Sequence, residues 1–147
     1  NDAPSTITRL QNMGTPDYLI SAAVTVVLAQ RLARKNCSGC REPDPDVTKD
    51  VLKEMNFTEE QISTAKVSRG KGCSKCKDSG YKGRMGIYEI LSVTKPIKEA
   101  ILKKATTPEL KAIALSEGFR TMQDMGRTLI LNGDLNFREF DRVLSME

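Results

Sequence analysis

The stretch CSGCREP at residues 37–43 and the later stretch GCSKCKDSGYKGR at residues 72–84 each contain a C-x-x-C pair. All four cysteines lie in these two stretches, as two C-x-x-C pairs: Cys37 with Cys40, and Cys73 with Cys76. One C-x-x-C turn directs two thiolates at an ion, and a second completes a tetrahedron with sulfur about 2.3 Å from zinc. The chain contains no histidine, so the thiolates would have to be the whole ligand set. The spacing predicts a structural zinc site.

Three other interpretations of the cysteines remain open at this point. Iron in a rubredoxin-like site uses the same four ligands, and two disulfides are compatible with an even number of cysteines. A redox-active C-x-x-C occurs in thioredoxin-like proteins, usually once and near the start of a helix. A closed site of four cysteines has no open coordination position, so a metal here would hold shape and would not catalyse.

Basic side chains crowd both cysteine turns. They are Arg34, Lys35, Arg41, Lys71, Lys75, Lys77, Lys82 and Arg84. Zinc with four thiolates carries a net charge of −2, which nearby cations would offset. A solvated basic face explains the same residues equally well, and the sequence does not choose between the two.

The composition fits a globular chain of 147 residues with 29% charged and 39% apolar residues. A formal net charge of +4 and the absence of tryptophan make nucleic-acid binding a weak inference. The longest apolar run, LISAAVTVVLA at residues 19–29, is too short to cross a bilayer. The chain opens with NDAPSTITRL, without an initiator methionine or a signal peptide. We expect it to be a piece of something longer in preference to a processed product.

The first 30 residues predict two helices separated by Gly14–Pro16. The second, at about residues 16–28, is apolar nearly all round and is expected to be buried. Between the cysteine pairs, residues 47–63 predict two short helices beside the metal. A capping-box pattern from Thr58 to Gln61 marks the start of the second of them.

After the second cysteine pair, RMGIYEILSV at residues 84–93 predicts a strand with both faces partly covered. Four helices should follow. The first helix begins at Pro96. The second has Thr107 as its N-cap, Pro108 at N1 and Gly118 at its end. The third covers residues 121–132, and Asn136 with Glu139 caps the fourth. The predicted fold class is mostly α with a few strands (α+β).

Catalytic motifs are missing from the sequence. No G-x-x-x-x-G-K-[ST] occurs, and the nearest Gly–Lys pair, Gly70–Lys71, fails the spacing. A Ser–His–Asp triad is impossible without histidine. The residues alone indicate that this chain is not an enzyme by itself.

The order of the motifs resembles the C-terminal end of the secretion ATPases that drive type IV pilus assembly and type II secretion. The resemblance runs from NDAPSTITRLQNMG through LISAAVTVVLAQRLARKNC and the two C-x-x-C pairs to SGYKGRMGIYEIL and EGFRTMQDMGRTLILNGDLNFREFDRVL. It covers essentially the whole chain. The sequence G-I-Y-E at residues 86–89 is more typical of the pilus assembly branch, since the secretion branch more often shows G-I-H-E.

The resemblance implies a parent protein that is a hexameric, cytoplasmic P-loop ATPase, peripheral at the inner membrane. Its ATP hydrolysis, with Mg²⁺, would turn an inner-membrane platform protein and so add pilin subunits. Its partners would be neighbouring subunits of a homohexamer and the platform protein, with no nucleic acid and no membrane span. The motifs that bind ATP in such proteins lie upstream of the segment matched here.

For this chain the resemblance implies three parts: the tail of a RecA-like ATPase core at 1–36, a tetracysteine zinc insert at 37–83, and a strand with a helical subdomain at 84–147. The metal ligands carried over are Cys37, Cys40, Cys73 and Cys76. Arg9 and Arg31 match arginines that recur near the RecA-like core, where nucleotide sensing, subunit contact or a structural salt bridge would each fit.

Two alternatives to a pilus assembly motor stay open. One is the type II secretion ATPase of the same superfamily. The other is a freestanding zinc-knuckle module that binds a protein, because GCSKCKDSGYKG loosely resembles one C-x-x-C-x-G-x-G repeat of chaperone zinc modules.

Overall fold

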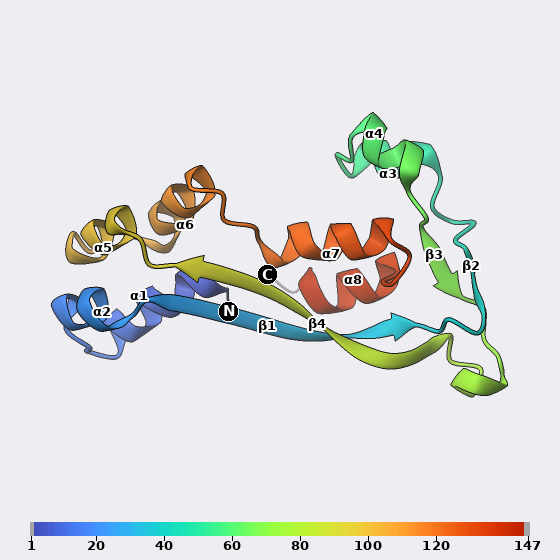
Figure 1. The fold of residues 1–147 in the computed structure, drawn as a ribbon, viewed down its shortest axis with the longest axis horizontal. Coiled ribbons are helices and arrows are strands. Elements are labelled where there is room, and N and C mark those ends of the chain that lie inside the picture. Colours follow the sequence, from blue (N-terminus) through green and yellow to red (C-terminus); the bar gives the residue numbers. More distant parts are fainter. Residues whose placement is uncertain (1, 146–147) are drawn as a thin grey trace. The chain divides into compact units, whose positions relative to one another are not determined.

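The computed structural model describes residues 2–145 and mixes helices with two small sheets (Figure 1). This confirms the predicted α+β class. The contacts divide the chain into two compact units. Unit 1 comprises Asn1–Gln30 and Tyr88–Met122, and unit 2 comprises Arg31–Ile87 and Gln123–Glu147. The division into 1–36, 37–83 and 84–147 stays a prediction.

Unit 1 is built from four helices and parts of two long strands. The helices are α1 (Ala3–Asn12), α2 (Asp17–Ala23), α5 (Lys95–Leu102) and α6 (Thr107–Ser116), and the strands are β1 (Val26–Asn36) and β4 (Tyr81–Ser92). β1 and β4 pair in a two-stranded sheet. Apolar side chains from all these elements form one core, which includes Ile7, Ile20, Val27, Leu91, Ile97, Ile101 and Leu110.

The prediction of a buried helix over residues 16–28 is wrong in its second half. Helix α2 ends at Ala23, and β1 begins at Val26. The run Val24-Thr25-Val26-Val27 is β-branched throughout, which lowers helix propensity and favours an extended backbone. The prediction that this segment is buried all round is also wrong, because Leu19 and Leu28 are about half exposed.

The strand predicted at residues 84–93 is confirmed as the greater part of β4, but only one of its faces is covered. Ile87 and Leu91 are buried, whereas Tyr88 and Ile90 are exposed. Successive side chains of a strand point to opposite faces, so one face meets the core and the other is open. The alternating apolar pattern did not reveal this difference.

Unit 2 contains the remaining elements. They are β2 (Arg41–Pro43), α3 (Lys49–Glu54), α4 (Glu59–Thr64), β3 (Ser68–Gly70), the 3₁₀ turn η1 (Ser74–Cys76), most of α7 (Met122–Leu131) and α8 (Phe137–Leu144). β2 and β3 form an antiparallel ribbon in which Glu42 lies opposite Arg69. The Arg69 Nε lies 3.3 Å from a Glu42 carboxylate oxygen, so an ion pair joins the two strands.

The two short helices predicted between the cysteine pairs are confirmed as α3 and α4, and the Thr58–Gln61 capping box is present. Their position differs from the prediction. Their buried residues, including Leu52 and Ile62, pack with Leu131 and Phe137. In Figure 1 the two helices lie beyond one end of the β2–β3 ribbon, and the η1 turn lies beyond the other. They therefore pack on α7 and α8 and not beside the cysteines.

The later helices follow most of their predicted signals. Pro96 lies in the first turn of α5, Gly118 follows α6 with a φ of +89°, and Asn136 caps α8. The N-cap of α6 is Thr106, one residue earlier than predicted, because the Glu109 carboxylate accepts hydrogen bonds from its N–H and hydroxyl. No helix within residues 2–145 is both long and apolar enough to cross a membrane.

Candidate metal centre

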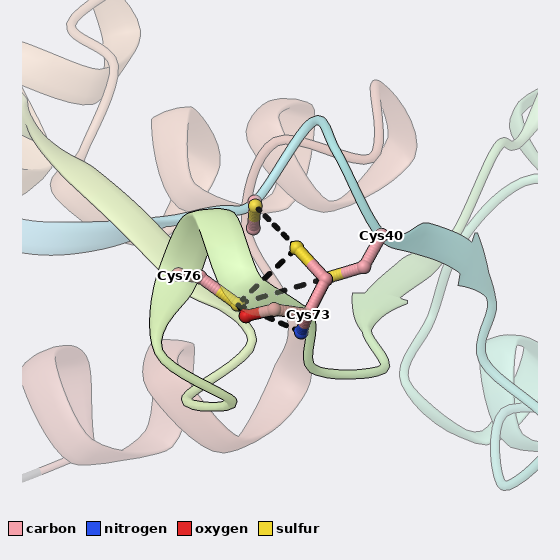
Figure 2. Close-up of side chains that lie close together, drawn as sticks. Cys40, Cys73 and Cys76 are labelled. Atoms are coloured by element: carbon pink, nitrogen blue, oxygen red, sulfur yellow. Dashed lines mark hydrogen bonds between the residues drawn. The ribbon is translucent and has the colours of Figure 1, made fainter.

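The four cysteines converge in unit 2, as their spacing predicted. Their Sγ atoms all lie within 4.8 Å of one another. Three of the separations are 3.9 Å (Cys37–Cys73), 3.8 Å (Cys40–Cys76) and 3.7 Å (Cys73–Cys76). Four sulfurs at zinc–thiolate distance form a tetrahedron with edges of about 3.8 Å. The thiols are unbridged and arranged to hold one ion (Figure 2).

The second cysteine pair is shaped by a tight turn. The Cys73 carbonyl accepts hydrogen bonds from the N–H groups of Cys76 (3.2 Å) and Asp78 (2.9 Å). Lys77 and Asp78 both adopt positive φ, at 52° and 62°, which closes the turn back toward the sulfurs. The first pair is tied to the second, since Cys37 N–H donates to the Gly80 carbonyl at 2.9 Å. One hydrogen-bonded framework therefore positions all four thiols.

Backbone N–H groups point at two of the sulfurs. Gly72 N–H donates to Cys40 Sγ at 3.2 Å, and Cys73 and Gly80 donate to Cys76 Sγ at 3.2 and 3.3 Å. Donors of this kind stabilise thiolates, which are the form that binds metal.

The pKa values of the thiols differ accordingly. Burial raises the pKa of Cys40 to about 12. At Cys76 burial also opposes ionisation, but the hydrogen bonds from Cys73, Gly80 and the neighbouring thiols lower the pKa to about 6. Cys76 therefore ionises more readily than Cys40. A metal ion would have to displace the remaining protons, so its affinity would rise with pH.

Glycines allow the two turns to approach this closely. A Cβ added to Gly70 would lie 1.9 Å from the Gly80 carbonyl oxygen, so the backbones touch where side chains would keep them apart. A Cβ on Gly39 would lie 3.0 Å from the Lys75 side chain and 3.5 Å from Cys73 Sγ. Gly72 has a φ of +108°, a conformation that other residues rarely adopt.

Asn36, which directly precedes Cys37, fastens the centre to the rest of unit 2. Its side chain is buried, and its amide donates to the carbonyls of Ser68 and Gly133 at 3.0 Å each. Its backbone N–H donates to the Asp134 carbonyl, and its Oδ1 accepts from Asn136. The end of β1, the β3 strand and the α7–α8 turn therefore meet at one side chain.

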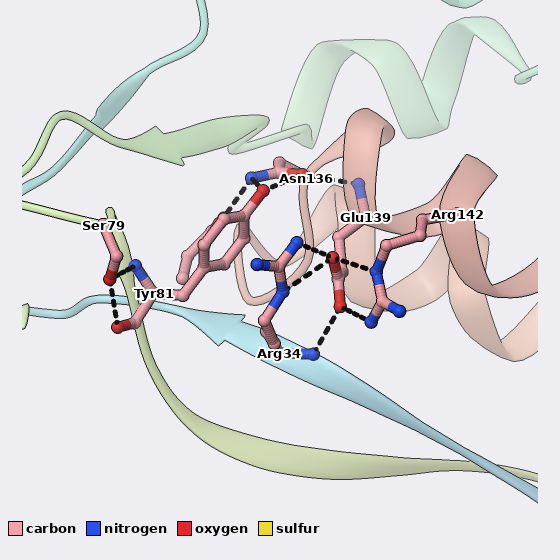
Figure 3. Close-up of polar contacts among 7 residues, drawn as sticks. Arg34, Ser79, Tyr81, Asn136, Glu139 and Arg142 are labelled. Carbon is pink, nitrogen blue, oxygen red and sulfur yellow. Dashed lines mark hydrogen bonds and ion pairs between the residues drawn. The ribbon is translucent and has the colours of Figure 1, made fainter.

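A second polar cluster lies around Glu139 on α8 (Figure 3). Arg34 donates to its carboxylate from the side chain, at 2.7 and 3.0 Å, and from its backbone N–H at 2.8 Å. Arg142 donates to it as well. The Arg34 guanidinium lies 4.1 Å from the ring centroid of Tyr81, whose hydroxyl contacts Asn136. The sequence indicated Asn136 and Glu139 only as a helix cap, because nothing in their spacing signals contacts with strands 100 residues away.

Most of the basic residues flanking the cysteines are exposed. Lys71, Lys75, Lys77, Lys82 and Arg84 face solvent, and none has a side-chain ion pair within residues 2–145. Lys35 and Arg41 pair with Asp134. Within the described residues, the hydrogen bonds to the cysteine sulfurs come from backbone N–H groups and from the thiols, which favours the interpretation of a solvated basic face.

Arg9 and Arg31 belong to different compact units. Arg9 is exposed in the last turn of α1, in unit 1. Arg31 belongs to unit 2, where its Nη1 donates to the Val143 carbonyl at 2.5 Å. This contact ties the Arg31 side chain to α8, and a nucleotide-sensing, subunit-contact or structural function for either arginine stays a prediction.

Comparison with known proteins identifies relatives over almost the whole chain. The family model described as type II/IV secretion system protein matches residues 1–142. The type IV pilus assembly ATPase PilB of Pseudomonas aeruginosa is 37% identical over 143 residues, covering 97% of this chain and 25% of the relative. PilB of Thermus thermophilus is 38% identical over 142 residues, covering 95% of this chain and 16% of the relative.

The secretion branch matches as well, at lower identity. The type II secretion system protein E of Pseudomonas aeruginosa is 32% identical over 147 residues, covering 100% of this chain and 28% of the relative. The chain thus spans about a quarter or less of the length of these relatives. The extent of the family match, together with the tetracysteine centre and the motifs that follow it, shows that this chain belongs to the type II/IV secretion system protein family.

Proposed function

We propose that this chain is the C-terminal, metal-stapled part of an ATPase that powers type IV pilus assembly. In the whole protein, ATP hydrolysis with Mg²⁺ would be performed by residues outside this chain, in a homohexamer that acts on an inner-membrane platform protein. The segment 1–36 would complete a RecA-like core, 37–83 would form the zinc insert, and 84–147 would form the strand and helical subdomain.

The pilus branch is favoured by one observation above all. The pilus assembly relatives are 34–38% identical to this chain, whereas the type II secretion relatives are 30–32% identical. The family match over 142 residues argues against a freestanding zinc-knuckle module, since such a module would need only the cysteine turns and their surroundings.

Zinc is the proposed occupant of the cysteine centre. The sulfur separations of 3.7–3.9 Å match the edge of a zinc–thiolate tetrahedron, and both cysteine pairs come from short turns with N–H groups directed at sulfur. Cys37, Cys40, Cys73 and Cys76 would be the ligands. A closed set of four leaves no position for substrate, so the ion would fix the fold of unit 2 and perform no chemistry.

The proposal predicts that replacing two of the cysteine ligands abolishes both metal binding and pilus assembly. Cys73→Ser/Cys76→Ser in the full-length protein should lower the zinc content from one per chain to near zero and stop pilus assembly in cells. Elemental analysis and counting of surface pili would measure the two effects. Ser74→Ala, in the same turn and exposed, is the matched control and should keep both.

Separate outcomes would contradict separate parts of the proposal. Normal piliation in cells carrying a double variant without metal would show that the metal is dispensable. Wild-type protein that contains iron would overturn zinc alone. Loss of protein secretion with normal piliation would assign the chain to the type II branch.

A further inference from the structure

Two oppositely charged surfaces of unit 2 lie beyond the two ends of the β2–β3 ribbon (Figure 1). The basic knuckle surface consists of Lys71, Lys75, Lys77, Lys82 and Arg84, and residues 71–84 contain five basic residues against one acidic. The acidic lobe consists of Asp46, Asp50, Glu54, Glu59 and Glu60 on and around α3 and α4, and residues 46–60 contain five acidic residues against two basic. Every side chain of both surfaces is exposed.

The basic side chains have no partners of their own. None of the five forms an ion pair within residues 2–145, and their one acidic neighbour in the segment, Asp78, is also exposed. Lys82 and Arg84 are two residues apart on β4, and both side chains are exposed. A cavity beside the same turns is lined by Lys35, Asn36, Ser38, Arg41, Lys82 and Asp134. Asp134 pairs there with Lys35 and Arg41, so Lys82 is the lining cation that contributes to the basic knuckle surface.

Part of the acidic lobe is likewise unpaired. Glu59 pairs with Lys53, and Asp46 pairs with Arg69. Within residues 2–145, the carboxylates of Asp50, Glu54 and Glu60 form no ion pair. These three carboxylates remain available to a partner of opposite charge.

The fold keeps the two surfaces from meeting within one molecule. The β2–β3 ribbon lies between them, with the η1 turn beyond one end and α3 and α4 beyond the other (Figure 1). The lobe is held in that place by its packing on Leu131 and Phe137. The basic knuckle surface and the acidic lobe therefore do not pair with each other within one molecule.

We propose that the basic knuckle surface binds the acidic lobe of a second copy of this chain, head to tail. Two different patches that complement each other make a heterologous contact, which closes into a ring or continues as a chain of subunits. The inference deepens the proposed homohexamer by naming a surface through which its subunits meet. It does not require the metal to be zinc or the machine to be a pilus.

Charge reversal tests the contact. Sedimentation velocity of the metal-loaded chain, over a range of protein concentrations at low salt, should show self-association that is lost at about 0.5 M salt, where charges are screened within a few ångströms. Lys82→Glu/Arg84→Glu should weaken association about tenfold or more. Glu54→Lys/Glu60→Lys should have a similar effect from the other side. Lys95→Glu/Lys103→Glu, in unit 1, changes net charge equally and should leave association unchanged.

Recombining the variants makes the test specific. Mixing the two charge-reversed variants should restore one interface and give a 1:1 complex, and a chain carrying all four reversals should regain self-association. Metal content and circular dichroism would confirm that each variant is folded.

A chain that stays monomeric at every concentration, or association that these reversals do not change, would overturn the proposal. So would binding of anionic lipid vesicles or of duplex DNA that depends on Lys82 and Arg84 while the chain stays monomeric, because the surface would then serve another partner. Each of these results leaves the test of metal content and piliation unaffected, so failure of this inference is distinguishable from failure of the proposed function.

Discussion

At the scale of single residues, a buried carboxylate stabilises the C-terminal part of unit 2. The Glu139 side chain is 0% exposed, which opposes ionisation. The hydrogen bonds and charges of Arg142 and Arg34 outweigh this cost and lower the pKa to about 2, from an ordinary value of 4.5. Both arginines are about half exposed, so water reduces the net strength of the pairs.

This pKa predicts a pH-dependent contribution to stability. A depressed pKa stabilises the fold above the ordinary value of 4.5, and the contribution is lost as the pH falls from 4.5 toward 2. The loss should be about 2–3 kcal/mol across that window. Urea unfolding at several pH values would measure it as the difference between wild type and Glu139→Gln. A constant difference between the two proteins over that window would contradict the assignment.

The contact between Gly70 and Gly80 gives a second prediction at this scale. Gly70→Ala should cost about 2–4 kcal/mol of unfolding free energy, because a backbone carbonyl must move to make room for the new Cβ. Metal affinity should fall in the same variant. Gly83→Ala is the matched control, since it has a φ of +79° but open space around it, and should cost only about 1–2 kcal/mol. Equal losses in chemical denaturation would contradict the importance of close approach.

At the scale of elements, the contact between α7 and α8 depends on a small residue. A Cβ added to Gly126 on α7 would lie 2.6–2.7 Å from side-chain carbons of Leu144 and Phe140 on α8. The two helices therefore approach each other over the space that a side chain would fill. The sequence pattern does not mark Gly126 as a packing residue, because a glycine inside a helix indicates only low helix propensity.

Gly126→Ala tests this packing. The higher helix propensity of alanine contributes about 1 kcal/mol, but overpacking costs about 1–3 kcal/mol, so the variant should be less stable overall. Phe140→Leu should relieve the crowding, so the double variant should lose less than the sum of the two single changes. Thermal and urea unfolding of the three variants would show the coupling. Additive losses would mean that the helices can separate without cost.

At the scale of the whole molecule, the metal centre belongs to one compact unit only. All four cysteines and their hydrogen-bonded framework lie within Arg31–Ile87, whereas the core of unit 1 is formed by other residues. The lobe formed by α3 and α4 has only three buried apolar residues in its cluster, Leu52, Phe57 and Ile62. A cluster of this size contributes little stability alone, so this part should depend most on the metal.

Removing the metal should therefore loosen the chain unevenly. Hydrogen exchange after chelation should show loss of protection at residues 72–80, along β2 and β3 and in α3 and α4, while α1, α5 and α6 keep theirs. Readdition of zinc should restore the pattern. Uniform loss of protection in both units would contradict the prediction, as would no loss at all.

The sequence alone determined the features that arise from neighbouring residues or from strong motifs. The convergence of the four cysteines, the Thr58–Gln61 capping box and the Asn136 cap are predicted correctly, because their geometry is local or their spacing is that of a shared site. The α+β class follows from the same local patterns. The family resemblance came from the order of such motifs.

Tertiary structure decided what depends on distant partners. The run after Ala23 becomes β1 because it can pair with β4, a strand more than 50 residues away. Only packing shows that one face of β4 is covered, that α3 and α4 lie on α7 and α8, and that Asn36 and Glu139 join strands to helices. The local sequence pattern indicates which secondary structure a segment can adopt, whereas the burial of its side chains depends on which other segments pack against it.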